Sequence, residues 1–387
     1  MPGSSDFVYM DYAATTPLNS LVAERMRTVQ NSACFNPASN HIAGRQSAKV
    51  VMQAATELGL LLNVSPDSIL WTSGATESNN LAILGAARQR AHRGKHLITM
   101  RTEHKAVIDV FRALEKQGFE VSWLAPKPDG QLPVERLIST LRDDTQLVSI
   151  MHINNETGVI QDIAALGAAC KERDVLFHVD GAQAAGKIPV DLAALPVDLY
   201  SLTAHKFYGP KGVGALFVAN GTPLEPLMFG GGQQQRMRPG TLPVDLIAGL
   251  GVAAAVATTS IADDLAKLTG LKGRLLQGIQ DIEGLQVNGP AKGGYPGILN
   301  VGVDDVDGES LLLAMEPLCV ATGSACNSRS QEPSSVLRAL GRTDRQAQSA
   351  IRFSLGRPTT AADIEMAISS YRHAVRKLRA LAPERPA

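Results

Sequence analysis

Lys206 stands where a short apolar stretch meets a turn, and its surroundings suit a lysine that does covalent chemistry. Residues 199–202 are apolar or aromatic apart from one serine and indicate the end of a buried strand, and Gly209-Pro210 closes the turn after the lysine. A lysine held between a strand end and a Gly/Pro turn has a short, defined reach, which an enzyme needs to hold an aldehyde cofactor as a Schiff base. The same stretch also fits a solvated lysine beside a hairpin, so other parts of the chain must decide.

Polar residues with complementary chemistry follow the other predicted strands. The groups that follow successive strands are Thr72-Ser-Gly-Ala-Thr-Glu-Ser78, Glu103-His104, Asn154-Asn155, Asp180 with Gln183, and Thr203 to Lys206. The first group places a glycine among hydroxyl residues at the start of a helix, and exposed N–H groups in such a turn can hold a phosphate. Taken alone, that turn favours a simple helix cap. In an open α/β sheet, ligands bind beyond the carboxyl ends of the strands, so these groups are expected to gather at one edge.

One cofactor would use all of these groups. Pyridoxal phosphate needs an anion site, a partner that stacks on its ring, a carboxylate for its ring nitrogen and a lysine that forms an imine. Each residue also has a simpler structural interpretation: Asp180 could cap a helix, His104 could be a hydrogen-bonded core residue and Asn155 could hold a turn. Their arrival in order at successive strand ends favours a shared cofactor site over these separate explanations.

The elements that must position these residues can be read from hydrophobic periodicity. From about residue 68 to residue 218, short apolar runs alternate with helix-period segments such as residues 107–114, where apolar side chains recur every three or four positions. Strands that alternate with helices indicate a mainly parallel sheet covered on both faces. Beyond Gly230-Gly-Gly232, long helices at 265–282 and 364–378 with brief strands near 298–301 and 351–354 predict a smaller α+β domain. We therefore expect a large domain over residues 16–250 and a small domain built from residues 1–15 and 251–387.

Composition excludes several classes of protein. Lys+Arg and Asp+Glu number 37 each, and no long basic run is present, which argues against a non-specific nucleic-acid binder or a membrane-surface protein. The N-terminus has no signal-peptide pattern. Residues 246–262 lack charge but are rich in Ala, Gly and Thr and slightly too short to span a bilayer, which predicts a buried helix. The four cysteines show neither metal-ligand spacing nor the density of a secreted scaffold, so we expect a cytoplasmic protein with free thiols and no metal site.

Motifs along nearly the whole chain resemble those of one family. They are the groups above, Met10-Asp-Tyr-Ala-Ala-Thr-Thr-Pro17, Arg238-Pro-Gly-Thr241, Gly323-Ser-Ala-Cys326 with Glu332-Pro-Ser334, and Ile351-Arg-Phe-Ser-Leu-Gly-Arg357. The sequence resembles the cysteine desulfurases of the NifS/IscS type, most closely the IscS-like subgroup, which are class-V aminotransferase-like enzymes of fold-type I. This resemblance implies a large α/β domain with a mainly parallel sheet of the seven-stranded type, covered by helices, plus a smaller α+β domain. The segment around Cys326 is the most specific motif, since it separates desulfurases from relatives that only transaminate.

The resemblance also implies roles for individual residues. Lys206 would hold pyridoxal phosphate covalently, His104 would stack on the ring and assist proton transfer, and Cys326 would be the nucleophile. The other cofactor contacts would be Asp180 to the ring nitrogen, Gln183 to the phenolic oxygen, Ala75, Thr76, Thr203 and His205 to the phosphate, and Thr241 to the phosphate from a second subunit. Asn155, which also lies at the cofactor, and Arg352 would hold the substrate carboxylate, a planar anion that suits a guanidinium group.

The implied reaction removes sulfur from L-cysteine, gives L-alanine and leaves a persulfide on Cys326 of a homodimer. The sulfur would pass to an acceptor protein, for iron–sulfur cluster assembly, tRNA thiolation or another sulfur-containing cofactor. Two alternatives stay open: a related enzyme such as a selenocysteine lyase or an aminotransferase, and a nucleotide-binding module suggested by Gly209-x-x-Gly212-x-Gly214. The second pattern is weak because it precedes a strand and not a helix. The sequence departs from the family pattern at Pro239, where serine is usual, and at Gln233-Gln-Gln235, which replaces a His-Glu pair.

Overall fold

Two sheets organise the chain in the computed structural model, which describes residues 7–290, 293–322 and 332–381. The larger sheet has seven strands in the spatial order β2, β8, β7, β6, β5, β3 and β4. Their bounds are β2 Ile69–Thr72, β3 His96–Met100, β4 Glu120–Leu124, β5 Thr145–Met151, β6 Leu176–Asp180, β7 Leu199–Thr203 and β8 Gly214–Val218. All neighbouring pairs are parallel except those of β8, which runs antiparallel to β2 and β7. The predicted mainly parallel, seven-stranded sheet is confirmed.

Helices cover both faces of this sheet. They are α2 Ile42–Leu62, α3 Ala75–Gln89, α4 Lys105–Lys116, α5 Val134–Thr140 and α6 Ile163–Glu172, with a short 3-10 turn, η1, at Pro66–Ser68. Strands β3, β5, β6 and β7 are buried at every position. Consecutive strand residues point to opposite faces, so Leu176 packs in one hydrophobic cluster with α3 and α4, whereas Phe177 packs in another with α2 and α6. Burial on both faces explains why these strands read as continuous apolar runs and not as alternating ones.

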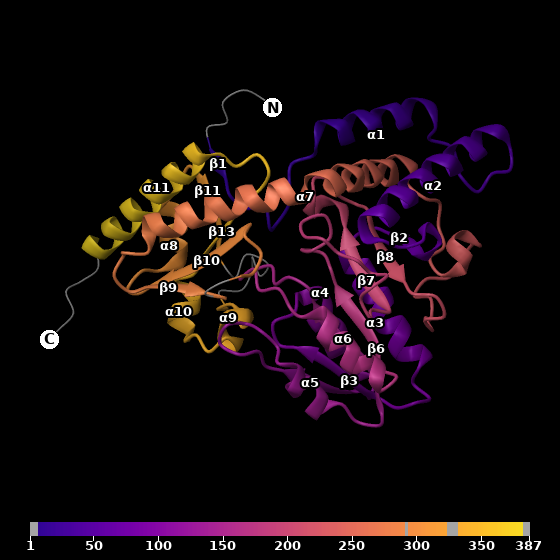
Figure 1. The fold of residues 1–387 in the computed structure, drawn as a ribbon, viewed down its shortest axis with the longest axis horizontal. Coiled ribbons are helices and arrows are strands. Elements are labelled where there is room, and N and C mark those ends of the chain that lie inside the picture. The colour runs from indigo at the N-terminus through magenta and orange to yellow at the C-terminus, as the bar shows by residue number, and fades with distance from the viewer. Residues whose placement is uncertain (1–6, 291–292, 323–331, 382–387) are drawn as a thin grey trace.

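A single long helix, α7 (Val244–Ile279), connects the two parts of the molecule (Figure 1). It packs against α1 (Ser20–Ser32), α2 and α11 (Ala361–Leu381). By length and composition alone it could cross a membrane, but more than half of its most apolar window is buried in the protein, as in a core helix. The sequence predicted a buried helix at 246–262 and a separate one from 265. The structure corrects this, because α7 continues through both segments. It also runs through residue 250, where the sequence predicted the end of the large domain.

The second part contains a four-stranded antiparallel sheet in the order β12-β13-β10-β9. Its elements are β9 Leu285–Asn288, β10 Ile298–Val303, β12 Ala321–Thr322 and β13 Ile351–Ser354, with helices α8 Gly308–Ala314, α9 Ser335–Ala339 and α10 Asp344–Gln348. The N-terminal strand β1 (Val8–Tyr9) pairs in parallel with β11 (Leu318–Cys319), and Asp11 bridges to Ser354 of β13. The first residues of the described chain therefore associate with its C-terminal part before the chain enters the large sheet.

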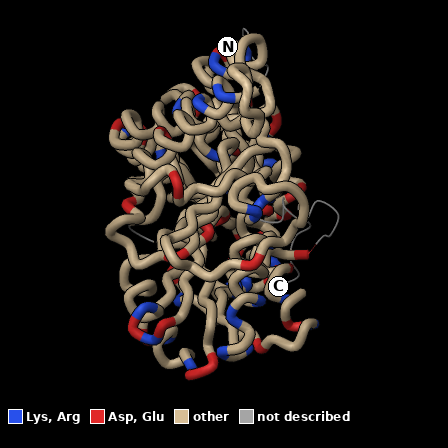
Figure 2. The backbone as a smooth tube through the Cα atoms, turned by 90° about the vertical axis from the view of Figure 1, so that its right-hand side faces the viewer, with Lys and Arg blue, Asp and Glu red and all other residues tan. Residues whose placement is uncertain are grey.

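Charged residues of both signs are interspersed over the backbone, as Figure 2 shows. Most described ion pairs join exposed side chains, such as Arg142 with Glu120 and Arg274 with Glu365. Exposed pairs contribute little to stability. Three better-shielded pairs, Arg352–Asp11, Arg238–Glu77 and Arg357–Asp264, lie at the edge of the large sheet or at its junction with the second part.

Candidate active site

Lys206 ends a short 3-10 turn, η2 (Ala204–Lys206), directly after β7. Its Nζ donates hydrogen bonds to the backbone oxygens of Ala13 and Ala14, at 2.5 and 2.7 Å. The strand after it, β8, pairs with β7, so the hairpin considered from the sequence does exist. However, the lysine is half-buried and bound to the N-terminal segment, and it follows the carboxyl end of β7, where a cofactor is expected.

The N-terminal segment holds the lysine turn in place. The backbone N–H and the hydroxyl of Thr16 both donate to the oxygen of His205, at 2.9 and 3.0 Å, and the same hydroxyl accepts from the N–H of Tyr208 at 2.7 Å. His205 Nδ1 lies 3.1 Å from the Thr15 hydroxyl. Burial, with help from the positive charge of Lys206, lowers the pKa of His205 to about 4, so its ring is neutral at pH 7. Thr15 and Thr16 belong to one of the family-like motifs, but no local pattern predicts that they hold the lysine turn.

Asp180 lies at the end of β6, the strand next to the one that carries the lysine. Its carboxylate is buried and accepts two hydrogen bonds, from Asn79 Nδ2 at 2.8 Å and from the N–H of Ala182 at 2.9 Å. The other amide atom of Asn79, Oδ1, is buried and has no hydrogen-bond partner among the described residues. Asn79 was not anticipated, although its place four residues after Ala75 puts it one helical turn behind the phosphate turn. Its amide holds the carboxylate in a fixed orientation.

His104 caps the N-terminus of α4 and also faces the site. Its Nδ1 accepts from the N–H of Ala106 at 3.1 Å, so the neutral ring carries its proton on Nε2. Burial lowers its pKa, the Asp180 carboxylate opposes this shift and the Lys206 ammonium adds to it. The structural interpretation of His104 is confirmed by its helix cap, and its role at a cofactor stays a prediction.

The start of α3 forms a cradle for an anion. Gly74, with a φ of 152° that suits glycine, precedes the helix, and no side chain caps its N-terminus. A Cβ on Gly214 would lie 2.7 Å from Gly74 Cα, so strand β8 needs glycine there to approach this turn. A Cβ on Gly74 would lie 3.5 Å from the Thr203 hydroxyl. The N–H groups of Ala75 and Thr76 thus open a helix beside a hydroxyl, which suits a phosphate group.

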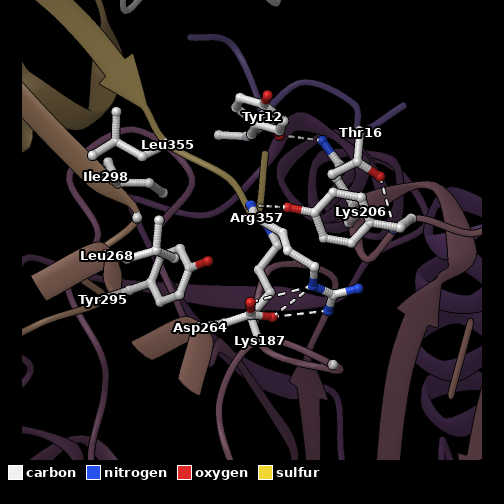
Figure 3. A pocket seen from close by; sticks show the side chains of 14 residues that line it. Tyr12, Thr16, Lys187, Lys206, Asp264, Leu268, Tyr295, Ile298, Leu355 and Arg357 are labelled. Carbon is white, nitrogen blue, oxygen red and sulfur yellow. Dashed lines mark hydrogen bonds and ion pairs between the residues drawn. The ribbon is translucent and has the colours of Figure 1, made fainter. Parts of the chain in front are cut away.

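Gln183 lies against the same backbone oxygen as the lysine. Its Nε2 donates to Ala13 O at 2.8 Å, and its Oε1 accepts from Lys187 Nζ at 2.6 Å. A cavity beside both lysines is lined by the N-terminal segment, by α7 and by the C-terminal part (Figure 3). Burial, then the charges of Lys206 and Arg352, lower the pKa of Lys187 well below its usual range. Lys187 was not anticipated, and it is a second lysine within the electrostatic range of the site.

Arg352 reaches the site from the second sheet. Its side chain is 5% exposed; NH2 pairs with Asp11 at 2.5 Å and NH1 donates to the backbone oxygen of Asn155 at 3.0 Å. The remaining donor, Nε, is buried and has no partner within the described ranges. Glu156, which follows Asn155 in the chain, accepts a hydrogen bond from the Ser334 hydroxyl at 2.5 Å. Burial raises the pKa of Glu156 to about 7, although the hydrogen bond from Ser334 and the charge of Arg352 both lower it.

The sequence predicted two further site residues. Cys326 lies outside the described residues. Thr241 is exposed, in the loop that precedes α7. Of the other cysteines, Cys34 is exposed, while burial raises the pKa of Cys170 to about 12 and also raises that of Cys319. A raised pKa keeps a thiol protonated, which makes the buried Cys170 and the half-buried Cys319 poor nucleophiles.

The described residues fit pyridoxal phosphate. A strand-end lysine, a carboxylate on the neighbouring strand, a neutral histidine near both and an uncapped helix N-terminus lie at one edge of the sheet, and each matches one group of that cofactor. Within the described part of the chain, no group of three or more His, Cys, Asp or Glu residues is arranged to bind a metal ion.

Comparisons with known proteins agree with this geometry. The family model of class-V aminotransferases matches residues 8–366. The proteins called Cysteine desulfurase IscS from Klebsiella pneumoniae (strain 342) and Escherichia coli (strain K12 / DH10B) are both 49% identical to the chain over 381 residues, which cover 97% of this chain and 94% of theirs. A solved structure of a NifS-like protein is similar with a TM-score of 0.90 and 32% identity, covering 96% of this chain and 100% of that one. SspA in complex with cysteine has a TM-score of 0.80 at 34% identity, with 90% and 98% of the two chains covered.

Proposed function

The chain belongs to the class-V aminotransferase family and resembles its cysteine desulfurases, and we propose that it uses pyridoxal phosphate to remove sulfur from L-cysteine. L-Alanine is one product, and the sulfur remains as a persulfide on Cys326. The observation that carries this proposal is the convergence of Lys206, Asp180 and His104 at one edge of the sheet. A solved relative whose title describes it in complex with cysteine supports the choice of substrate.

Residues of the large sheet would hold the cofactor. Lys206 would bind its aldehyde carbon, Asp180 its ring nitrogen and Gln183 its phenolic oxygen. The phosphate would lie at the start of α3, against the N–H groups of Ala75 and Thr76, with Thr203 and His205 beside it. When bound, the cofactor supplies an electron-withdrawing ring that stabilises negative charge at the substrate α-carbon.

The chain's own groups then move protons and orient the substrate. Lys206 is the base placed to take the α-proton, and the neutral His104 can exchange a proton through Nε2. Arg352, with Asn155 beside it, would hold the substrate carboxylate, and its Nε is a buried donor without a described partner. The Cys326 thiolate attacks the substrate sulfur: a sulfur–sulfur bond forms, the Cβ–S bond breaks and Cβ gains a proton, so atoms and electrons balance without an external oxidant.

Substitution of Cys326 tests this function. Cys326→Ser should still bind pyridoxal phosphate and should still change its absorbance when cysteine is added, because the cofactor residues stay in place. Alanine release should fall roughly 10³-fold or more, and no persulfide should form. The variants Cys34→Ser, Cys170→Ser and Cys319→Ser should stay active. Essentiality of another cysteine would overturn the assignment of Cys326, and activity of all four variants would favour a lyase that releases sulfide directly.

We also propose that the enzyme is a cytoplasmic homodimer in which Thr241 completes the partner's phosphate site. The exposed position of Thr241, away from its own phosphate turn in sequence, supports this, and two-fold dimers are the commonest assemblies. A mixed dimer of one Lys206→Ala chain and one Thr241→Ala chain should regain one intact site and about half of the activity of the unmodified dimer. If the mixed dimer is no more active than the two variant homodimers, Thr241 does not act across the interface. The sulfur acceptor would be a protein thiol, and trapping the persulfide on its acceptor would identify it.

A further inference from the structure

An ion pair lies at the mouth of the proposed phosphate cradle. Glu77, in the first turn of α3, accepts two hydrogen bonds from Arg238, from Nε to Oε1 at 2.7 Å and from NH2 to Oε2 at 3.2 Å. Its Oε2 also accepts from the N–H of Ser73 at 2.7 Å. The two side chains are only 20% and 19% exposed. A two-pronged, largely shielded contact of this kind is stronger and more directional than a surface ion pair.

The loop that carries Arg238 is held independently of this pair. The side-chain amide of Gln234 accepts from the N–H of Trp71 at 2.6 Å and donates to its oxygen at 3.0 Å, as a neighbouring strand would. Gln234, Gln235 and Arg236 all have positive φ values, between 48° and 65°. Such conformations are costly for residues other than glycine and persist only where the surroundings impose them. Arg238 is therefore presented to Glu77 from a fixed loop docked on the edge strand β2.

The carboxylate of Glu77 would repel a phosphate bound at the start of α3, and Arg238 neutralises that carboxylate. The carboxylate lies in the same helical turn as the N–H groups of Ala75 and Thr76, which would hold a phosphate dianion. An acidic group in the first turn is favourable for the helix itself, but it repels a second anion bound there. Although burial alone would raise the pKa of Glu77, the hydrogen bonds from Arg238 and Ser73 lower it, so the group is ionised at pH 7. Its charge needs a partner before the turn can accept phosphate.

We propose that Arg238 is a positioning residue for the cofactor site: it neutralises Glu77 and holds both carboxylate oxygens on protein donors, so that the start of α3 can bind the cofactor phosphate. This inference rests on the proposed function, because it concerns how the chain binds pyridoxal phosphate. A purely structural role is the competing explanation, since Thr241 follows Arg238 by three residues in the same loop. The two explanations differ in what removal of both charges does.

The test is a double-mutant cycle that measures the dissociation constant of pyridoxal phosphate by the absorbance of the bound cofactor. Arg238→Met should weaken binding roughly tenfold to a hundredfold, as when a shielded charge loses its partner. Glu77→Gln should change binding only a few-fold. The double variant Glu77→Gln/Arg238→Met should bind more tightly than Arg238→Met alone, because the repelling charge is gone. Arg236→Met, which removes an exposed positive charge from the same loop, is the matched control and should bind like the parent.

Binding of pyridoxal, which lacks the phosphate, separates charge from loop structure, because Arg238→Met should leave it unchanged. A double variant as weak as Arg238→Met, or equal losses for pyridoxal and pyridoxal phosphate, would overturn the inference in favour of a structural role. If Arg238→Met does not fold, Arg238→Lys replaces it in the test, because lysine keeps the charge without the two-pronged contact. Arg238→Lys should bind pyridoxal phosphate with a dissociation constant within about threefold of the parent. A larger loss overturns the inference. Failure of the parent protein to bind pyridoxal phosphate would instead contradict the proposed function itself.

Discussion

The active site combines two regions that are built differently. At the carboxyl edge of the large sheet, Asp180 and Lys206 follow adjacent parallel strands, and His104 follows another strand of the same sheet. At the junction between the two sheets, by contrast, Arg352 meets Asp11 across 341 positions of sequence and Asn155 across 197. The sheet edge is assembled as soon as neighbouring strands pair, whereas the junction exists only after the C-terminal part has docked.

The two regions also differ in which kind of polar atom stays unsatisfied. At the sheet edge the Asp180 carboxylate accepts two hydrogen bonds, burial lowers the pKa of His104, and a described atom left without a partner, Asn79 Oδ1, is an acceptor. At the junction, Arg352 keeps one buried donor without a described partner, and partial burial raises the pKa of Glu156 to about 7. The sheet edge thus holds its carboxylate on fixed donors, as the proposed permanent cofactor requires. The junction holds an open donor, which suits a substrate that enters and leaves.

The largest effect is expected at the sheet edge. Lys206→Ala should abolish both the visible absorbance of bound pyridoxal phosphate and turnover, a loss of roughly 10³-fold or more, because the covalent link and the proton acceptor disappear together. Lys187→Met is the matched control, since it removes the other lysine of the cavity and should leave the cofactor bound covalently. Absorbance spectra before and after borohydride reduction measure this. A reducible, coloured cofactor in Lys206→Ala would show that another lysine binds it covalently. Lys187, which lines the same cavity, would be the first to test.

A smaller and different effect is expected at the junction. Arg352→Gln should raise KM for cysteine roughly 100-fold while kcat falls much less, because the proposed charged contact to the substrate carboxylate is lost and the cofactor site remains. The control is Asp11→Asn, which removes the ion pair and keeps the guanidinium. If Arg352 mainly fastens the two parts together, Asp11→Asn should reproduce the rise in KM and both variants should lose thermal stability. Steady-state kinetics together with Tm separate these outcomes.

The smallest effect concerns pH and stability at the junction. The pKa of Glu156 in the folded protein, about 7, lies above its ordinary value of 4.5, so the folded state keeps a proton that the unfolded state has lost between these two pH values. The free energy of unfolding should therefore fall as pH rises from about 4.5 to 7, and the cost should be constant above that. Glu156→Gln removes this cost, on the order of 3 kcal/mol. The Tm of Glu156→Gln minus that of the parent should increase between pH 5 and pH 8. A Tm difference that does not change with pH would contradict the raised pKa.

The sequence alone determined those features that depend on short stretches of chain. The apolar runs before Thr72, Asp180 and Thr203 predicted the strands, and the polar residues after them predicted the edge of the sheet that carries the site. This succeeded because strand periodicity and turn composition act over a few residues, and because parallel strands place their carboxyl ends together. The roles of Cys326 and Thr241 came from the resemblance of their motifs, and they stay predictions.

Only the tertiary structure decided which distant groups support those residues. Asn79 orients Asp180, the segment at Ala13 to Thr16 clamps the lysine turn, and Arg238 neutralises Glu77, although no local pattern indicates any of these partners. The continuity of α7 was missed for a related reason, since packing against α1, α2 and α11 stabilises a helix beyond what its own sequence predicts. The charge states of Glu156 and Lys187 likewise follow from burial. Burial depends on which segments pack together, and a side chain's own neighbours in sequence do not specify that.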